Sequence, residues 1–297
     1  MNNEFTNIFP VKSLPEIKNY LLSNKLQEVR IKIEKPIIMT IGNREVISDY
    51  IVSNEDLKYI LQRISNYSLY AYEEEIRQGF ITIKGGHRVG IAGECVNESG
   101  KIKTIRNISS LNVRICREIL GCSDKIMNYL VDERKVYNTI IISPPKCGKT
   151  TLLRDIARNL SLKGKKISII DERSEIAACY LGIPQMNIGI RCDVLDNCLK
   201  SEGMIMAIRS LSPDVIVCDE IGTDKDIEAL NMAFNSGVNV IITIHGADIS
   251  DLFNRDCFNK LIDNNILERV VVLENREKVG QIKGIYKIGD KQCLKLF

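Results

Sequence analysis

The sequence predicts an α/β protein of two domains, an N-terminal α+β domain over residues 1–120 and an α/β domain over 121–297 with a largely parallel sheet. Its 297 residues are 44% hydrophobic and 27% charged, which is typical of a globular chain long enough for two cores. Before Gly121, helical and strand patterns follow one another irregularly. After Gly121, strand-length apolar runs alternate with helical stretches.

The N-terminal domain combines helical periodicity with alternating strands. Apolar residues at helical spacing predict helices over 14–23, 54–64 and 69–78, the second of them capped by Ser53. Alternation predicts strands over 29–33, 37–41 and 111–117. Residues 80–83 and 89–92 predict a β-hairpin, and we expect its Gly-rich turn to carry His87 and Arg88.

The second domain contains a series of apolar runs of strand length. The predicted strands cover 137–142, 167–171, 214–219, 238–244 and 268–273. Helical stretches between them are typical of parallel strands joined by crossover helices. Because the carboxyl ends of parallel strands share one edge of a sheet, we expect the residues that follow these strands to meet there.

The first of these strands leads into a loop and a helix with the spacing G-x-x-x-x-G-K-[ST], except that Ser143 replaces the first Gly. Such a loop offers successive backbone N–H groups to phosphate oxygens, and the helix directs its positive end at the same charge. The spacing predicts a Walker A loop for ATP, and the alternative is a Pro-Gly turn before a surface helix. The predicted nucleotide-binding residues are Ser143, Pro144, Pro145, Lys146, Cys147, Gly148, Lys149, Thr150 and Thr151.

Individual positions of the loop carry separate expectations. Lys149, with an exposed and mobile ammonium, would contact the β- and γ-phosphates, and the Thr150 hydroxyl would complete the shell of Mg²⁺. A positive φ at Ser143 would cost about 1 kcal/mol more than with Gly. Cys147, beside Lys146 at a helix N-terminus, is either the most modifiable thiol of the chain or an inert small residue.

Two acidic pairs follow other predicted strands. Asp219 suits the water shell of Mg²⁺ and Glu220 suits a general base that orients the attacking water, although acids at a strand end can also be an ordinary surface feature. Asp171 and Glu172 end another strand at the same edge. A Rossmann-type acid that binds a ribose hydroxyl is the alternative for this pair, and Gly-Lys-Thr argues against it because dinucleotide loops carry G-x-G-x-x-G.

The chain has two histidines. His245 follows the strand over 238–244, and its place at the sheet edge predicts a γ-phosphate sensor, with a hydrogen-bonded structural histidine as the alternative. For His87, the functional and structural interpretations both stay open.

Composition limits the partners and the compartment. A net charge of +3, from 41 basic and 38 acidic residues, does not indicate nucleic-acid binding through bulk charge. The ten cysteines form no C-x-x-C pair, which argues against a metal cluster and fits a reducing cytoplasm. No apolar run approaches the ~20 residues that span a bilayer, and the N-terminus lacks a signal sequence, so we expect a cytoplasmic protein.

Several of these motifs together resemble a known family. One set of motifs resembles the secretion ATPases of type II and type IV secretion and of type IV pili. This set consists of Arg209–Glu220, Ala229-Leu230, Gly237 and Thr243–His245. In that family the loop is followed by an "Asp box" (here Asp171, Glu172 and Glu175), a Walker B segment and a "His box". The segment from Phe80 to Gly246 resembles the stage III sporulation protein AA family more closely still. The runs that carry this resemblance are Gly-Gly-His-Arg-Val-Gly, Asn-Val-Arg-Ile, Cys-Gly-Lys-Thr-Thr-Leu-Leu-Arg-Asp, Asp-Glu-Arg-Ser-Glu-Ile and Ser-Pro-Asp-Val-Ile-Val. That family has Gly at positions 143 and 146, where this chain has Ser and Lys.

The resemblance implies a RecA-like P-loop NTPase domain and a homo-hexameric ATPase that uses ATP and Mg²⁺. It implies a place in the mother-cell cytoplasm, where the ATPase would dock on membrane proteins of a channel to the forespore and either assemble that channel or drive transport. Two other functions stay open: a nucleic-acid motor, which nucleic acid would stimulate, and a nucleotide-gated scaffold with very slow turnover.

The resemblance also points to arginines of the N-terminal domain. In the secretion ATPases this domain closes over the nucleotide and contributes arginines, and transition-state charge on a γ-phosphate needs a cation beyond the loop lysine. We therefore expect Arg88 or Arg114, with Arg117 as a third candidate, to complete the site of a neighbouring subunit. The alternative is a solvated charge or a structural ion pair.

Overall fold

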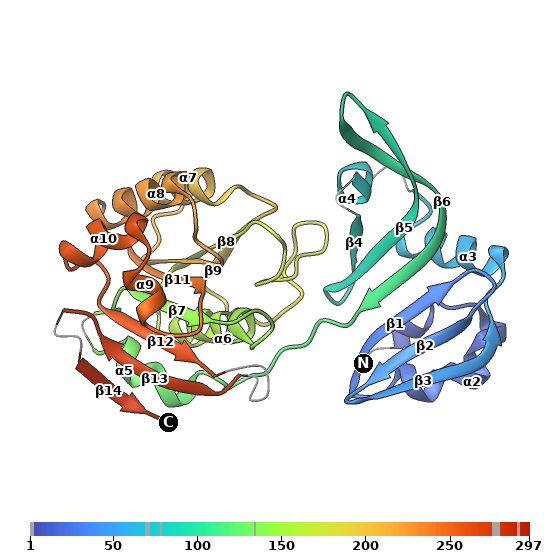
Figure 1. Ribbon diagram of the computed structural model, residues 1–297, viewed down its shortest axis with the longest axis horizontal. Coiled ribbons are helices and arrows are strands. Elements are labelled where there is room, and N and C mark those ends of the chain that lie inside the picture. Colours follow the sequence, from blue (N-terminus) through green and yellow to red (C-terminus); the bar gives the residue numbers. More distant parts are fainter. Residues whose placement is uncertain (1–2, 69–71, 78, 134, 275–279, 290–291) are drawn as a thin grey trace. The chain divides into compact units, whose positions relative to one another are not determined.

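The computed structural model describes residues 3–68, 72–77, 79–133, 135–274, 280–289 and 292–297 (Figure 1). The chain forms two compact units, Met1–Arg117 and Glu118–Phe297. The predicted boundary after residue 120 falls near this division.

The first unit is a six-stranded antiparallel sheet, in the order β3-β2-β1-β6-β5-β4, with short helices packed against it. Its strands are β1 Leu26–Lys32, β2 Pro36–Ile41, β3 Arg44–Ile51, β4 Phe80–Ile83, β5 His87–Glu98 and β6 Lys101–Arg114. Its helices are α1 Asn3–Thr6, η1 Val11–Ser13, α2 Leu14–Leu21, α3 Asn54–Ile64 and α4 Glu73–Arg77. Alternate strand residues such as Val29 and Val113 are buried with Leu21 and Leu57 in one core.

Two local predictions in this unit can be compared with the structure. The predicted cap of α3 is confirmed, because Ser53 Oγ accepts from Asp56 N at 3.2 Å and Asp56 Oδ2 accepts from Ser53 N at 2.9 Å. The expected turn position of His87 and Arg88 is wrong: both belong to β5, where they pair with Ile83 and Thr82 of β4. The predicted helix over 69–78 includes residues 69–71 and 78, which lie outside the described residues.

The second unit is built on an eight-stranded sheet in the order β14-β13-β12-β7-β11-β10-β8-β9. Its strands are β7 Thr139–Ser143, β8 Ile167–Asp171, β9 Cys192–Asp196, β10 Val215–Cys218, β11 Asn239–His245, β12 Arg269–Leu273, β13 Ile282–Lys287 and β14 Gln292–Leu296. The six strands from β12 to β9 are parallel, and β13 and β14 add an antiparallel edge. The predicted α/β class with a largely parallel sheet is confirmed.

Helices cover both faces of this sheet (Figure 1). They are η3 Asp124–Ile126, α5 Met127–Leu130, α6 Lys149–Leu162, α7 Lys200–Ser210, α8 Asp224–Asn235, α9 Ser250–Phe253 and α10 Asp256–Asp263. Apolar residues of α5 and α6 share one core, and those of α7, α8 and α10 share the other. Because β7, β8 and β10 are buried from both sides, their sequences are almost continuously apolar.

The segment that enters the second unit is bound to α6 through a buried carboxylate. Asp155 accepts hydrogen bonds from Gly121 N (3.1 Å), from Ser123 N (2.8 Å) and from Ser123 Oγ (2.8 Å). Burial opposes ionisation of this group, but the hydrogen bonds from Ser123 and from Arg158 outweigh it and lower the pKa of Asp155. The chain is thus attached at residues 121–123 to the helix that begins at the phosphate loop.

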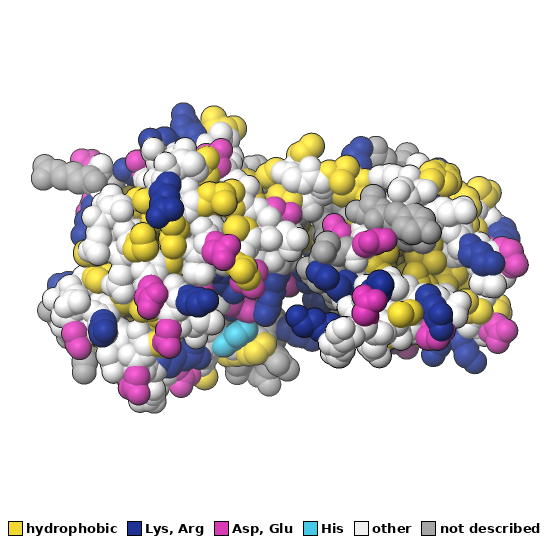
Figure 2. Space-filling view, turned by 90° about the horizontal axis from the view of Figure 1, so that it is seen from above, with side chains coloured by type: hydrophobic (Ala, Val, Ile, Leu, Met, Phe, Trp, Pro, Cys, Tyr) yellow, Lys and Arg dark blue, Asp and Glu magenta, His cyan; other side chains and the backbone are white. Residues whose placement is uncertain are grey.

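Two general features of the molecule are the distribution of charge on its surface and the length of its helices. Figure 2 shows charged side chains of both signs interspersed with hydrophobic ones over the face of the second unit that carries α7 and α8. Among the described residues, none of the helices has the length and apolar character needed to cross a membrane.

Candidate functional site

The phosphate loop leaves the centre of the parallel sheet, between β7 and α6. Ser143 is the last residue of β7, it pairs with His245 of β11, and its hydroxyl donates to the Pro144 carbonyl at 2.8 Å. The left-handed positions of the loop are Lys146 (φ 65°) and Gly148 (φ 90°), so the cost considered for a positive φ at Ser143 does not arise. The backbone strain of a residue with a Cβ falls instead on Lys146, at about 1 kcal/mol.

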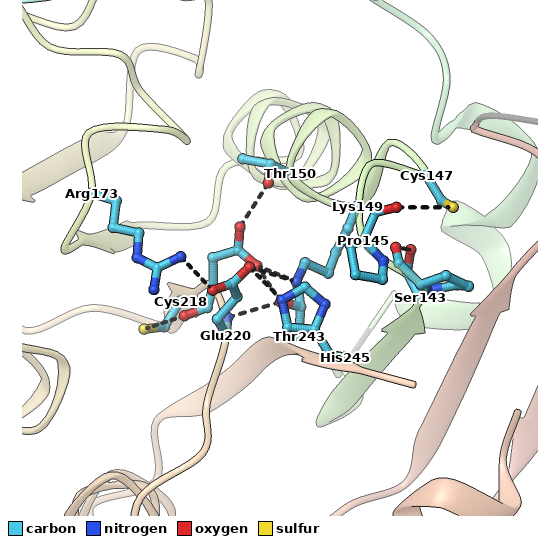
Figure 3. A network of polar contacts seen from close by, with 12 residues as sticks. Ser143, Pro145, Cys147, Lys149, Thr150, Arg173, Cys218, Glu220, Thr243 and His245 are labelled. Carbon is cyan, nitrogen blue, oxygen red and sulfur yellow. Dashed lines mark hydrogen bonds and ion pairs between the residues drawn. The ribbon is translucent and has the colours of Figure 1, made fainter. Parts of the chain in front are cut away.

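Lys149, the first residue of α6, lies inside a cluster of acidic side chains (Figure 3). Its Nζ is 3.1 Å from Glu220 Oε1 and 3.5 Å from Asp219 Oδ1, and the side chain is only 6% exposed. The expectation of an exposed ammonium is therefore wrong. These carboxylates provide the opposite charge that a buried ammonium requires.

Asp219 follows β10 and receives two hydroxyl groups. Thr150 Oγ1 donates to Asp219 Oδ2 at 2.7 Å, and Thr243 Oγ1 donates to Asp219 Oδ1. Thr243 Oγ1 also accepts from Glu220 N at 2.9 Å, which ties β11 to the end of β10. Sequence reasoning did not assign Thr243; the signal was a polar residue within an apolar strand, two residues before His245 and therefore on the same face.

Glu220 contacts three basic side chains of the site. Its Oε1 contacts Lys149 Nζ and lies 2.8 Å from His245 Nε2, and its Oε2 lies 2.8 Å from Arg173 Nη1 (Figure 3). Burial alone would raise the pKa of Glu220, but the attraction of Lys149, followed by that of His245 and Arg173, outweighs burial and lowers it. The backbone has φ 56° there, a conformation that a residue with a Cβ adopts at some cost.

The two acids at the end of β8, Asp171 and Glu172, have different environments: the first is structural and the second is more accessible. Asp171 is buried, and its carboxylate accepts from the backbone N–H groups of residues 175, 176 and 177 at 2.8–2.9 Å. Burial nevertheless raises its pKa to about 6, despite these hydrogen bonds. Glu172 instead forms an ion pair with Lys200 at the start of α7. These side chains line a pocket with Arg173, Asp219 and Glu220, and sequence reasoning assigned neither Lys200 nor Arg173.

The structure also describes the surroundings of three other predicted residues, Cys147, Arg88 and Arg114. Cys147 is fully buried, with Sγ 3.6 Å from the Pro145 carbonyl, which favours the inert interpretation. Arg88, in β5, lies over the Phe80 ring at 3.9 Å, and Arg114 is exposed at the end of β6. Both belong to the first unit, and their role at a nucleotide site stays a prediction.

His87 is a packed side chain of the first unit. It is 9% exposed, its Nδ1 accepts from Cys116 N at 3.2 Å, and its ring packs edge-on against Phe5. Burial lowers the pKa of His87 to about 4. This environment favours the structural interpretation.

The chemistry of the site follows from its donors. Backbone N–H groups at the start of α6, together with Lys149, suit a polyphosphate. The hydroxyl of Thr150 and the carboxylate of Asp219 are oxygen ligands of the kind that Mg²⁺ prefers, so these residues fit that ion. Among the described residues, no group of three or more His, Cys, Asp or Glu side chains could hold a metal ion.

Comparisons with known proteins agree with this geometry. A family model described as "Sporulation stage III, protein AA" matches residues 12–292. Stage III sporulation protein AA of Bacillus subtilis (strain 168) is 46% identical over 268 residues, which cover 88% of this chain and 87% of that protein.

Solved structures of a pilus retraction motor and of a bacterial ATPase share the fold at low sequence identity. The pilus retraction motor PilT, solved with bound ADP, aligns with a TM-score of 0.60 and 16% identity over 88% of this chain and 77% of that one. The ATPase DotB of Legionella pneumophila aligns with a TM-score of 0.57 and 17% identity over 84% and 72%. The chain thus shares its fold with these two proteins, and by its sequence it belongs to the stage III sporulation protein AA family.

Proposed function

We propose that this protein binds ATP with Mg²⁺ and hydrolyses it to ADP and phosphate. The observation that carries the proposal is the cluster of Lys149, Thr150, Asp219 and Glu220, in which the residues of a Walker A loop contact the acids that follow β10. A lysine, a hydroxyl, a carboxylate ligand and a candidate base, all within contact distance of one another, are the parts that phosphoryl transfer to water requires.

Each residue has a distinct task in this reaction. Backbone N–H groups of the loop would hold the phosphates, and Lys149 would exchange Glu220 for the β- and γ-phosphates. Glu220 would orient a water whose oxygen attacks the γ-phosphorus; the bond to the bridging oxygen of ADP breaks, and Glu220 accepts the proton of the water. Thr150 and Asp219 would hold Mg²⁺, which offsets negative charge on the phosphates when bound.

The test is phosphate release by the purified protein. Glu220→Gln keeps the shape of the side chain and removes the base, so hydrolysis should fall by about 100-fold or more. Glu228→Gln, at an exposed position on α8, is the matched control and should hydrolyse ATP at the wild-type rate. If wild-type protein bound no ATP in a calorimetric titration, the proposed function would be refuted.

At the cellular level we propose a homo-hexamer in the mother-cell cytoplasm, bound peripherally to membrane proteins of a complex between mother cell and forespore. Turnover of ATP would assemble this channel or drive transport through it. Membership of a sporulation family and the fold shared with a pilus motor and with DotB support this proposal. Particle mass with and without ATP, and co-purification with membrane proteins from sporulating cells, would test it.

The proposal includes an arginine delivered from a neighbouring subunit. Arg88 and Arg114 are cross-strand neighbours in β5 and β6, so they place two cations side by side, and Arg117 follows shortly after β6. An Arg→Ala protein, whose own loop is intact, would be mixed with Lys149→Ala protein, whose arginines are intact. Recovery of hydrolysis above the sum of the separate proteins supports the shared site; mixed assemblies without recovery, for all three arginines, refute it.

A further inference from the structure

The two carboxylate oxygens of Glu220 face different partners. Oε1 points at Lys149, and thus at the place where the phosphates would lie, and it also contacts His245. Oε2 contacts the guanidinium of Arg173 at 2.8 Å (Figure 3). When Lys149 turns to a phosphate, Glu220 loses one of its three contacts with basic side chains, and its orientation then depends on the contacts that stay.

We propose that Arg173 is a positioning residue for ATP hydrolysis, which holds Glu220 Oε2 so that Oε1 stays directed at the phosphates and the attacking water. This inference rests on the proposed function. An arginine on one carboxylate oxygen limits rotation of the group and leaves the other oxygen available for a water. Arg173 acts through Glu220 and belongs to the same chain, in contrast to an arginine delivered by a neighbouring subunit.

The backbone that carries Arg173 is held more firmly than its side chain. Arg173 is 62% exposed, so its side chain loses rotamer freedom when it holds Glu220, but a well-held backbone adds no further loss of entropy. The carboxylate of Asp171 binds three N–H groups of the following turn, and Ser174 Oγ donates to Asp196 at 2.5 Å. From α6, Arg154 donates to the carbonyls of Glu175 (2.8 Å) and Ile176, which links this turn to the phosphate-loop helix.

An arginine in this position could instead contact the γ-phosphate itself. Measurements of turnover and of nucleotide affinity distinguish that role from the positioning of Glu220. A residue that acts through Glu220 changes the turnover number and leaves nucleotide affinity unchanged. Its removal should also have no effect once Glu220 has lost its base function, because the two residues then act as one unit. A phosphate ligand would weaken nucleotide binding and would add its loss to that of Glu220→Gln.

The experiment measures kcat, KM and nucleotide affinity for Arg173→Ala and Arg173→Lys, and single-turnover hydrolysis for Glu220→Gln with and without Arg173→Ala. We expect Arg173→Ala to lower kcat by about 10- to 100-fold with KM and affinity unchanged. Arg173→Lys should recover part of the loss, because a point charge replaces the planar fork. The double variant should hydrolyse ATP within about twofold of Glu220→Gln alone.

Arg191→Ala serves as the control for loss of an exposed arginine. Arg191 is exposed and immediately precedes β9, so it lies at the amino ends of the parallel strands, whereas the candidate site lies at their carboxyl ends. Its side chain donates to the Ser161 carbonyl, and its removal should leave kcat at the wild-type value. Normal kcat in Arg173→Ala, weaker nucleotide binding, or a further loss in the double variant would each overturn the positioning role. Failure of the proposed function is distinguishable, since wild-type protein would then release no phosphate.

Discussion

The buried ion pairs of Lys149 make one substitution informative about both binding and stability. Lys149→Ala removes the ammonium that lies between Asp219 and Glu220, which are 14% and 23% exposed. Removing one partner of a buried ion pair typically costs 3–5 kcal/mol. Because these carboxylates are partly solvated and Glu220 keeps Arg173 and His245, we expect a smaller loss of about 2–3 kcal/mol in the free energy of unfolding of the second unit.

Hydrogen exchange of the backbone amides of β7 and β10 would measure this loss without requiring a two-state transition of the whole chain. Calorimetric titration of the same folded protein should show no ATP binding, because the phosphates lose their charge partner. Lys163→Ala, at the exposed end of α6, controls for removal of a lysine and should change neither quantity.

A double-mutant cycle links the stability loss to the contact. In a Glu220→Gln background one of the two uncompensated charges is gone, so Lys149→Ala should cost about 1 kcal/mol less than in the wild-type protein. Equal losses in both backgrounds would show that the Lys149–Glu220 contact does not stabilise the ligand-free protein. Unchanged ATP affinity in Lys149→Ala would refute the assignment of the phosphate loop.

Three further predictions concern single groups. Glu220→Gln should still bind ATP with Mg²⁺ and accumulate as an ATP-bound assembly, which size-exclusion chromatography with nucleotide quantification would detect; normal turnover would move the role of base to Glu172. Since the pKa of His87 is about 4 in the folded protein and 6.5 is its ordinary value, the folded state holds fewer protons in this window. The first unit should therefore lose about 3 kcal/mol as pH falls from 6.5 to 4, and this slope in urea titrations should disappear in His87→Gln. Asp155→Ala leaves the N–H groups of Gly121 and Ser123 without their acceptor, so it should destabilise the second unit by about 3 kcal/mol by hydrogen exchange, whereas the wild-type value would exclude this attachment.

The sequence predicts best those strands whose burial on both faces makes them continuously apolar. Strands β7, β8, β10, β11 and β12 were all expected, because each lies inside the parallel sheet. Strand β9, Cys-Asp-Val-Leu-Asp, was missed because it is half exposed at the sheet edge, and β13 and β14 form the other, antiparallel edge. Strand β3 was missed for the same reason, since polar residues interrupt it at the edge of the first sheet.

In the candidate site, too, some residues could be predicted from the sequence and others could not. The loop residues are contiguous, so their spacing alone indicates a phosphate site. The contacts of Arg173, Lys200 and Thr243 depend on which strands are neighbours, and strand order is not a local property of the sequence. The burial of Lys149 could not be predicted either, because it results from acids about 70 residues further along the chain closing around the ammonium.

The contact between Lys149 and Glu220 makes nucleotide binding a competition. Glu220 is an internal rival of the γ-phosphate for the same ammonium, and because it is tethered nearby its effective concentration does not fall when nucleotide becomes scarce. If ATP binds as proposed, its affinity should be lower than the phosphate contacts alone would provide, and ADP, which lacks the γ-phosphate, should compete less well still. Recapture of Lys149 by Glu220 after hydrolysis would favour departure of the product and restore the ion pair between the two side chains.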